Sequence, residues 1–135
     1  MARASVKGTI MGSEIPLKKN KHYDAKIVDV MLMEKTDSIL VKMEVVGSGD
    51  DKDFNSEGYQ ISDFIELNLE KDFPTEVVKN LVSKKTSSFF NAVGEDSSDF
   101  DTDDLMHKSV SFSGYTKDDG YEVKFMINTY FHPQE

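Results

Sequence analysis

The sequence predicts a mainly β domain of the α+β class. One segment of helical periodicity, residues 75–93, is preceded by three strand-sized runs and followed by two more. The order strand, strand, strand, helix, strand, strand is the chain order of a five-stranded OB barrel with one capping helix between its third and fourth strands. A chain of 135 residues is enough for one domain, and we expect residues 1–15 to form a flexible arm.

The first strand is expected over residues 23–34. Its apolar side chains alternate as far as Ile27 and then change phase, because Val28 and Val30 follow. A shift of one residue turns the opposite face of a strand inward. A β-bulge or sharp bend near residues 27–29 is therefore predicted, and small closed barrels need strands that curve in this way.

The second and third strands are expected over residues 38–46 and 59–70, joined by a polar, acidic loop at 47–58. Alternation predicts one buried face in each strand. The side chains predicted to face inward are Ile39, Val41, Met43 and Val45 in the second strand and Tyr59, Ile61, Ile65, Leu67 and Leu69 in the third. Asp63 interrupts this pattern and Phe64 points the opposite way, so we expect one of them to have a special role.

The helix is predicted by apolar residues at helical spacing, together with signals at both ends. Pro74 suits a first helical turn, Glu76 suits the positive N-terminal end, and Gly94 is a natural C-terminal stop. The apolar stripe consists of Val77, Val78, Leu81, Val82, Phe89, Phe90 and Val93. We expect this stripe to cap the bottom of the barrel.

Residues 95–104 form an acidic, solvated loop, after which Leu105 and Met106 are expected to enter the core. The fourth strand is predicted over 109–116 and the fifth over 121–131, with an Asp-Gly hairpin connection at 117–120. In the fourth strand Val110 and Phe112 face inward and the intervening serines outward. In the fifth, one face carries Tyr121, Val123, Phe125 and Ile127, and the other carries Glu122, Lys124, Met126, Asn128 and Tyr130.

The net charge of −9 argues against a partner with a phosphate backbone, but its distribution changes this interpretation. The segments 95–104 and 47–57 carry −6 and −3, so the rest of the chain is neutral, and bases gather in residues 1–22. The absence of cysteine excludes disulfides and fits a reducing cytoplasm. No apolar run has the length of a membrane span or a signal peptide, so neither is expected.

No constellation of residues points to catalysis, a metal or a cofactor. Asp99, Asp101 and Asp103 are spaced like the start of a calcium loop, but its sixth position lacks glycine and its twelfth lacks glutamate. The three histidines are isolated from one another, and no phosphate-binding loop or nucleophile elbow is present. The sequence therefore predicts a protein that is not an enzyme.

The binding face of an OB barrel lies on strands two and three, between the loops that join strands one to two and four to five. Single-stranded nucleic acids bind there by stacking bases on exposed rings and pairing phosphates with cations. The rings predicted to stack on bases are Phe64 and Tyr115. The lysines predicted to contact phosphates are Lys35, Lys42, Lys117 and Lys124.

Short motifs along residues 15–131 resemble those of small phage proteins of the OB type. The matching segments are residues 15–16, 23–27, 64–69, 89–94, 104–110 and 119–121, together with Ile127 and Tyr130. The resemblance implies a protein encoded near phage replication and recombination genes that binds single-stranded DNA. This chain departs from the family by having His107 in place of a usual glycine and by being more acidic than family members often are. It also lacks the acidic, aromatic-tipped tail of another type of phage single-strand binder. Recruitment of partners through a tail is thus not expected, and the acidic loop 95–104 is a hypothesis for that role.

The sequence thus predicts a non-catalytic single-stranded DNA-binding protein that acts in phage DNA replication or recombination with little sequence preference. The cytoplasm of an infected bacterium is its expected location. Expected partners are single-stranded DNA, other copies of the chain, and phage replication or recombination proteins. The alternative, favoured by the charge of −9, is an acidic DNA mimic or interaction protein that inhibits a host nucleic-acid-handling enzyme. A third reading is an OB module that binds a protein or a sugar.

Overall fold

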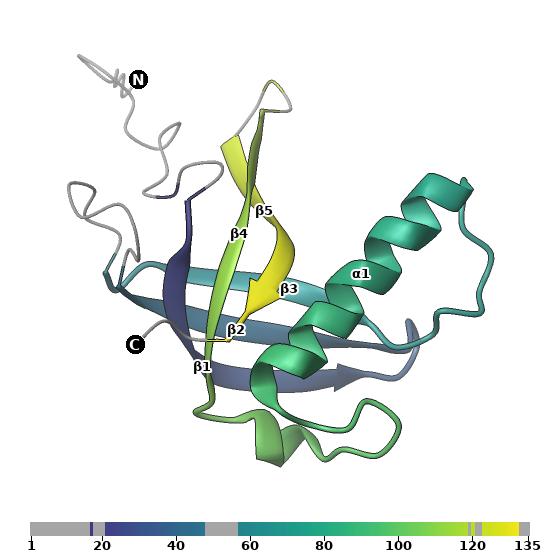
Figure 1. Cartoon of the computed structure of the whole chain (residues 1–135), viewed down its shortest axis with the longest axis horizontal. Helices are drawn as coiled ribbons and strands as arrows, with labels where there is room; N and C mark the ends of the chain where they lie inside the picture. The colour runs from purple at the N-terminus through teal and green to yellow at the C-terminus, as the bar shows by residue number, and fades with distance from the viewer. Residues whose placement is uncertain (1–16, 18–20, 48–56, 119, 121–122, 133–135) are drawn as a thin grey trace, which may run out of the picture.

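The computed structural model describes residues 17, 21–47, 57–118, 120 and 123–132. These residues form a curved, open, antiparallel sheet of five strands with one long helix (Figure 1). The elements are β1 (Tyr23–Met33), β2 (Ser38–Gly47), β3 (Gln60–Glu66), α1 (Glu76–Val93), the 3₁₀ helix η2 (Thr102–Leu105), β4 (Ser109–Asp118) and β5 (Val123–Phe131). The mainly β class and the helix between β3 and β4 are as predicted. The predicted arm at residues 1–15 lies outside the described part of the chain.

The strand order is β3-β2-β1-β4-β5, so β1 is central and β3 and β5 are the two edges. The first part of β1 pairs with β4 and its whole length pairs with β2, which requires it to bend (Figure 1). Val28 is an extra residue, because Ile27 pairs with Met43 while Asp29 pairs with Lys42. The bulge predicted from the phase change of the first strand is therefore confirmed, and it curves the sheet into a barrel-like shape.

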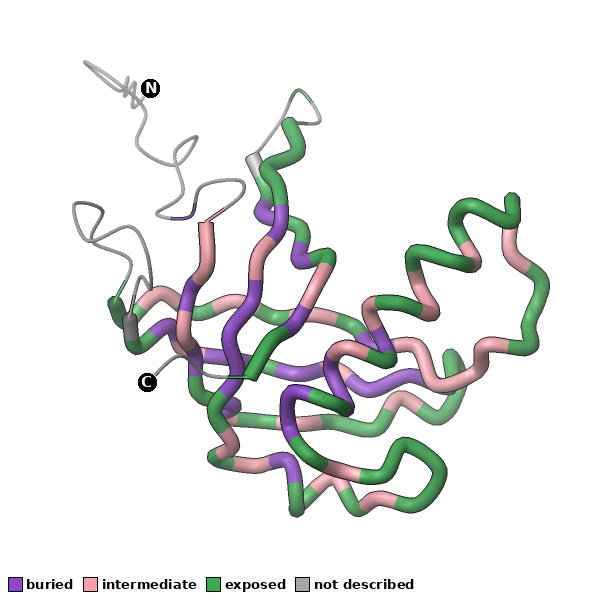
Figure 2. Tube along the Cα trace, viewed as in Figure 1, coloured by how far each residue is buried: buried purple, intermediate pink, exposed green. Residues whose placement is uncertain are grey.

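One hydrophobic core fills the concave side of the sheet (Figure 2). The side chains predicted to face inward from β2 are all fully buried, as are Val110 and Phe112. Leu105 enters this core from η2, as expected, and Met106 is half-buried. Ser111 was expected to face solvent but is also buried, where its hydroxyl donates a hydrogen bond to the Asp24 carboxylate.

The third strand is shorter than predicted because side chains after it bind the backbone. The Glu66 carboxylate accepts a hydrogen bond from the Asn68 N–H at 3.1 Å, and the Asn68 side-chain oxygen accepts one from the Glu70 N–H at 3.1 Å. Such local bonds favour turns over a continued ladder. The strand therefore ends at Glu66 instead of residue 70.

A bulge in β5 makes one predicted orientation wrong. Ser113 pairs with Thr129 and Gly114 with Ile127, so Asn128 is an extra residue without a partner. The phase of β5 changes there, and Tyr130 points into the core with 3% of its surface exposed. Gly114 fits beside the bulge because a Cβ at that position would come within 2.0 Å of the Met126 carbonyl oxygen.

The helix α1 has the predicted extent and a defined cap at each end. The Thr75 hydroxyl accepts a hydrogen bond from the Val78 N–H at 3.1 Å, so Thr75 is the N-cap and Pro74 precedes the helix instead of lying in its first turn. Gly94 ends the helix in the left-handed region, with φ of 74°. No helix in the described ranges is long and apolar enough to cross a membrane.

Candidate nucleic-acid interface

The two edge strands, β3 and β5, face each other across a seam that α1 closes along half its length. The Thr86 hydroxyl donates a hydrogen bond to the Glu66 carbonyl of β3 at 3.0 Å. The Tyr130 N–H of β5 donates one to the Ser88 hydroxyl at 3.0 Å. Backbone groups at sheet edges otherwise require water or another strand. The helix thus takes the place of a neighbouring strand at this half of the seam.

Asp63 joins the three elements around the seam. Its carboxylate accepts a hydrogen bond from the Tyr130 hydroxyl at 2.6 Å and forms an ion pair with Lys85 of α1 at 3.0 Å. Burial raises the pKa of Tyr130 well above its usual value, and the adjacent Asp63 charge and hydrogen bond raise it further. The special role expected for either Asp63 or Phe64 therefore includes Asp63, which anchors β3 to both β5 and α1.

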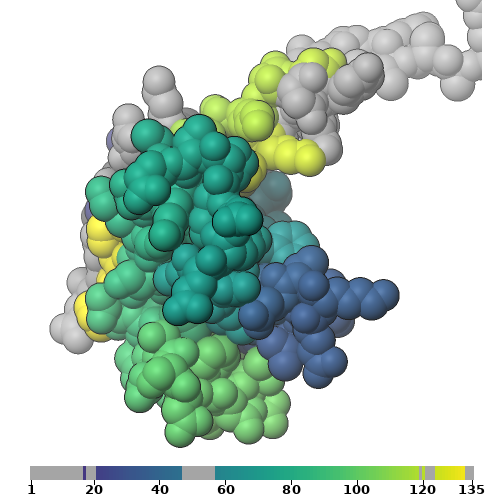
Figure 3. Space-filling model, turned by 90° about the vertical axis from the view of Figure 1, so that its right-hand side faces the viewer, coloured from purple at the N-terminus to yellow at the C-terminus, as the bar shows by residue number. Residues whose placement is uncertain are grey.

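Beyond these contacts the surface is hollowed between α1, the β4–β5 hairpin and the β1–β2 turn (Figure 3). A seam hollow of about 440 Å³ lies between Tyr59–Phe64 of β3 and Lys124–Ile127 of β5. A smaller hollow of about 220 Å³ lies between α1 and the hairpin, lined by Leu81, Tyr115 and Met126 among others. These two hollows share the lining residues Met126 and Ile127, so they adjoin one another.

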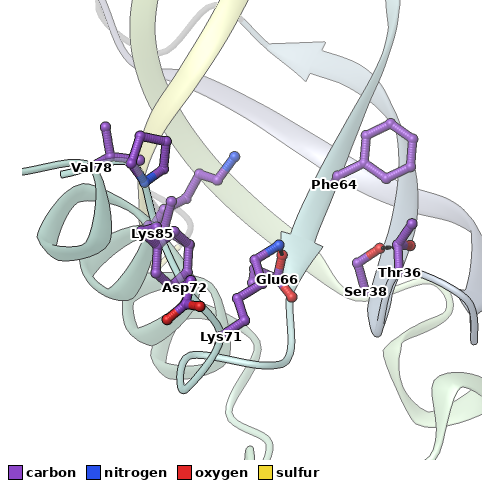
Figure 4. Close-up of a pocket in the computed structure, with 11 residues that line it drawn as sticks. Thr36, Ser38, Phe64, Glu66, Lys71, Asp72, Val78 and Lys85 are labelled. Carbon is purple, nitrogen blue, oxygen red and sulfur yellow. Dashed lines mark hydrogen bonds and ion pairs between the residues drawn. The ribbon is translucent and has the colours of Figure 1, made fainter. Parts of the chain in front are cut away.

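A third hollow, of about 480 Å³, lies between α1 and the β1–β2 turn. Phe64, Ser38 and Thr36 lie on one side and Val78 and Lys85 on the other, with the Lys71–Glu66 ion pair between them (Figure 4). The ring of Phe64 borders both this hollow and the seam hollow. The three hollows together therefore form one groove, which we call the seam groove.

The structure places both predicted rings on the seam groove. Phe64 is 56% exposed and Tyr115 45% exposed, which is unusual for large rings on two separate strands. Tyr115 pairs in register with Met126, which lines the seam hollow beside Phe64. The two rings therefore border the same continuous surface.

The predicted lysines lie in or around the same groove. Lys124 lines the seam hollow, and the exposed Lys117 is its partner in register on β4. Lys42 is exposed on the outer face of β2 and pairs with Ser62, a lining residue of the seam hollow. Lys35 is exposed in the β1–β2 turn, adjacent in sequence to Thr36 of the third hollow. Three of the six predicted residues, Phe64, Tyr115 and Lys124, therefore line the groove. Lys42 and Lys117 lie beside lining residues of the next strand, and Lys35 lies next to Thr36 in the β1–β2 turn.

Sequence reasoning missed the helix side of the groove. Val78, Leu81, Val82 and Lys85 line it, and Phe73 lies just before the helix, with the Lys71 ammonium 5.4 Å from its ring centre. The sequence did contain a signal, the apolar stripe of the helix. This stripe begins at Val77, three turns before Phe89, its first buried phenylalanine. The stripe was interpreted as core over its full length, although only its C-terminal part is buried.

The groove has little uncompensated negative charge, in contrast to the molecule as a whole. Three acidic residues line it. Asp63 and Glu66 are paired with Lys85 and Lys71, and the third is the exposed Asp72. The acidic segment 95–104 follows the other end of α1, and the hollow it borders shares no lining residue with the seam groove. Since a helix rises about 1.5 Å per residue, Gly94 lies roughly 20 Å along the axis from Leu81, beyond the screening length of about 8 Å at physiological salt.

The chemistry that the groove offers is binding through flat rings, aliphatic surface and ammonium groups. Within the described part of the chain, no three His, Asp or Glu side chains lie close enough to hold a metal ion. The aspartates spaced like the start of a calcium loop lie among local turns, in which the Asp101 carboxylate accepts a hydrogen bond from the Asp103 N–H at 2.9 Å.

No model of a known protein family matches the sequence, and no curated protein sequence matches it significantly. The functional assignment therefore depends on the fold and on the groove.

Proposed function

We propose that this protein binds single-stranded DNA in the seam groove of an OB-type barrel, without catalysis and with little sequence preference. The observation that carries the proposal is the arrangement of two exposed rings, Phe64 and Tyr115, along one groove that Lys124 also lines, with Lys42 and Lys117 on the neighbouring strands. Single-strand binders combine stacking rings with a cationic track for the backbone. A stacked ring contributes about 1–3 kcal/mol per base, so two rings suffice for measurable affinity.

The sheet topology supports the OB assignment. In an OB barrel the first strand pairs with both the second and the fourth, and the helix lies between the third and fourth strands. The pairings of β1 with β2 and β4 follow this scheme, and the groove borders β3 and the β4–β5 hairpin.

A backbone torsion supports the relationship to the phage OB-type proteins. His107 has a φ of 67°, in the left-handed region that glycine adopts without cost. The resembled family usually carries glycine at this position. A conformational requirement for glycine here accounts for both observations. On this resemblance we propose a role in phage DNA replication or recombination.

Fluorescence anisotropy with labelled oligo-dT tests the proposal. At low salt the protein should bind the oligonucleotide and release it progressively as salt rises, because lysine–phosphate contacts displace counterions. Phe64→Ala and Tyr115→Ala should each weaken binding about 5-fold to 100-fold, corresponding to a loss of about 1–3 kcal/mol of stacking. Lys42→Glu should weaken binding at low salt and reduce the salt dependence.

Matched controls lie outside the groove. Phe131→Ala removes a ring that is 36% exposed but stacks on His22, with 4.6 Å between ring centres. Lys84→Glu reverses an exposed charge on α1 that does not line the groove. Both should bind like the parent. Equal binding by the Phe64, Tyr115 and Lys42 variants would exclude the seam groove as the site.

A DNA mimic is the second candidate, favoured by the exposed carboxylates of segment 95–104. Asp96, Asp99, Asp101, Asp103 and Asp104 are all exposed there. A mimic should show no affinity for oligonucleotides at any salt concentration and should bind a basic protein instead. The same salt titration therefore separates the two candidates.

A further inference from the structure

The free edge of β3 in the seam is a second kind of binding site. Within the described ranges β3 pairs with β2 alone and β5 with β4 alone, so each has one open edge. We propose that the open half of the seam binds an extended peptide segment of a partner protein, which adds as a strand to β3. Strand addition of this kind uses main-chain hydrogen bonds for affinity and side-chain pockets for selectivity.

The backbone groups available for pairing follow from the β2–β3 register. The Tyr59 carbonyl accepts a hydrogen bond from the Val45 N–H at 2.8 Å, and Tyr59 therefore points its backbone groups toward β2. Antiparallel pairing alternates, so the backbone groups of Gln60, Ser62, Phe64 and Glu66 point into the seam. The hydrogen bond from Thr86 to the Glu66 carbonyl agrees with this assignment.

Helix α1 therefore hydrogen-bonds to Glu66, the last of the four residues whose backbone groups point into the seam. The backbone groups of the other three residues remain available for pairing. No other hydrogen bond engages the backbone groups of Gln60, Ser62 or Phe64 in the described structure. Three alternate residues present three N–H donors and three carbonyl acceptors, which match an extended peptide of about five residues.

The shape of the seam favours one extended peptide strand as the partner. The hollow is lined on both sides, by Tyr59–Phe64 of β3 and Lys124–Ile127 of β5. If the edge of another sheet paired with β3, the next strand of that sheet would clash with β5. A second copy of this chain therefore cannot pair here through its own sheet edge. A nucleic-acid strand has acceptor phosphates but no regular donors for the three carbonyl groups. A peptide backbone supplies both donors and acceptors.

The side chains along the seam favour apolar residues on the incoming strand. Ile61 is half-buried, and Phe125 and Ile127 keep 8% and 6% exposure where they line the hollow. On the outer side, Phe64 and Met126 are exposed at 56% and 38%. Cross-strand apolar pairs stabilise antiparallel sheets, so alternate peptide side chains would contact each of these two sets.

Direct binding measurements without nucleic acid test this inference independently of the proposed function. The probes are fluorescein-labelled peptides that alternate threonine with isoleucine, valine or phenylalanine, each with acidic end residues for solubility. Each peptide has a matched form with N-methyl groups on the alternate amides that would face β3. Anisotropy should show binding by at least one unmodified peptide and a loss of at least about 10-fold on N-methylation, since a methylated amide cannot donate. Absence of binding across the panel, or equal binding by the methylated forms, would overturn the inference.

A proline at Ser62 tests the edge from the protein side. Proline lacks an N–H and is tolerated on edge strands where that group faces away from the sheet. Ser62→Pro should therefore keep the β2–β3 ladder and abolish peptide binding, whereas Ser62→Ala should bind like the parent. Circular dichroism of both variants checks the fold. Should Ser62→Pro fail to fold, amide hydrogen exchange on the parent decides the question, because peptide binding should protect the Ser62 and Phe64 amides and leave exposed helical amides such as Asn80 unchanged. Unchanged exchange at Ser62 and Phe64 with bound peptide would overturn the proposal.

The two binding modes share residues and should exclude one another. Phe64 lines the seam hollow used by the peptide and also carries a proposed base-stacking ring. Excess peptide should therefore displace oligo-dT, while its N-methylated form should not. If oligo-dT fails to bind but the peptide binds, the proposed function fails and the strand-addition site stands.

Discussion

The two halves of α1 carry similar apolar residues but lie in different surroundings. Phe89, Phe90 and Val93, in the C-terminal half, are at most 5% exposed, whereas Val77 and Leu81, in the N-terminal half, are 67% and 60% exposed (Figure 2). Periodicity is the same in both halves, since it records only which side chains share one face of the helix. What covers that face depends on the sheet, which lies beneath the C-terminal half alone.

The exposed half is thus the part of the helix with a surface available for binding. Single exposed apolar side chains are common on soluble proteins, but here Val78 and Leu81 adjoin Phe64, Tyr115 and Met126 around one groove. Contiguous exposed apolar surface of this kind marks binding sites more often than single residues do. The contrast between the halves therefore separates the stabilising part of α1 from the part that borders the proposed site.

The largest difference should come from truncating one side chain in each half. Phe89→Ala removes a fully buried ring that contacts Phe90 and Tyr130, and it should lower the free energy of unfolding by about 3–5 kcal/mol. Leu81→Ala should change it by no more than about 0.5 kcal/mol, since the side chain is 60% exposed. Urea denaturation measures both. Similar losses for the two variants would contradict the division of the helix.

The next-largest effect concerns the hydrogen bond between Tyr130 of β5 and Asp63 of β3, beside the buried half of α1. Tyr130→Phe removes the hydrogen bond to Asp63 and should cost about 1.5–3 kcal/mol at neutral pH, the range for bonds to charged groups. Tyr115→Phe, which alters an exposed hydroxyl, should have no effect on stability. Urea denaturation of both variants provides the comparison.

The same buried tyrosine, Tyr130, should make the stability of the parent protein depend on pH in the alkaline range. The pKa of Tyr130 is raised in the folded state, so the unfolded chain loses its proton first, near pH 10. The stabilising contribution is complete below pH 10 and is lost as pH rises toward the folded pKa. Above pH 10 the stability of the parent should fall by about 1.4 kcal/mol per pH unit more steeply than that of Tyr130→Phe. Parallel pH profiles would contradict this assignment.

The exposed, N-terminal half of α1 should be stabilised mainly by its N-cap residue, Thr75. Thr75→Ala removes the hydrogen bond to the Val78 N–H and should cost about 1 kcal/mol, whereas Thr75→Ser should retain most of the stability. Amide hydrogen exchange should show the loss chiefly in the first turns of α1, because few tertiary contacts support them. Uniformly faster exchange along the whole helix would indicate that the two halves unfold together.

The smallest effect is expected at Val77, which is 67% exposed and lines none of the three hollows. Val77→Ala should raise the free energy of unfolding by a few tenths of a kcal/mol, since alanine has the higher helix propensity and no packing is lost. It should leave oligo-dT binding unchanged. A destabilisation of 1 kcal/mol or more, an order-of-magnitude threshold for lost packing, would show that a neighbour covers this residue.

The sequence was sufficient to predict the class, the element order and the first bulge, because each depends on local pattern. The phase change after Ile27 predicted the bulge at Val28, and alternation predicted the buried face of β2. Tyr130 was assigned to the wrong face because the bulge at Asn128 leaves no mark in the polar-to-apolar pattern. The early end of β3 depends on side-chain to backbone bonds at Glu66 and Asn68, which compete with the ladder and are not visible in periodicity.

The groove could be predicted only in part for a similar reason. Phe64 was recognisable as an outward-facing ring from strand alternation, and Tyr115 from its place at the last hairpin of the expected OB barrel. The contribution of Lys85 and Val78 could not be inferred, since it depends on where the first half of α1 crosses the open seam. Sequence pattern identifies which residues share a face of one element, whereas a groove is made by faces of different elements.

The unpaired residue Asn128 has a consequence for how this chain can change in length. Tyr130 reaches Asp63 only because one additional residue precedes it, so the number of residues between Met126 and Tyr130 must keep its parity. Deleting one residue there would rotate the phenol to the solvent side and detach β5 from both β3 and α1. Insertions at the tip of the β4–β5 hairpin leave the spacing between Met126 and Tyr130 unchanged. Related chains should therefore vary in hairpin length while conserving the spacing between the bulge and this tyrosine.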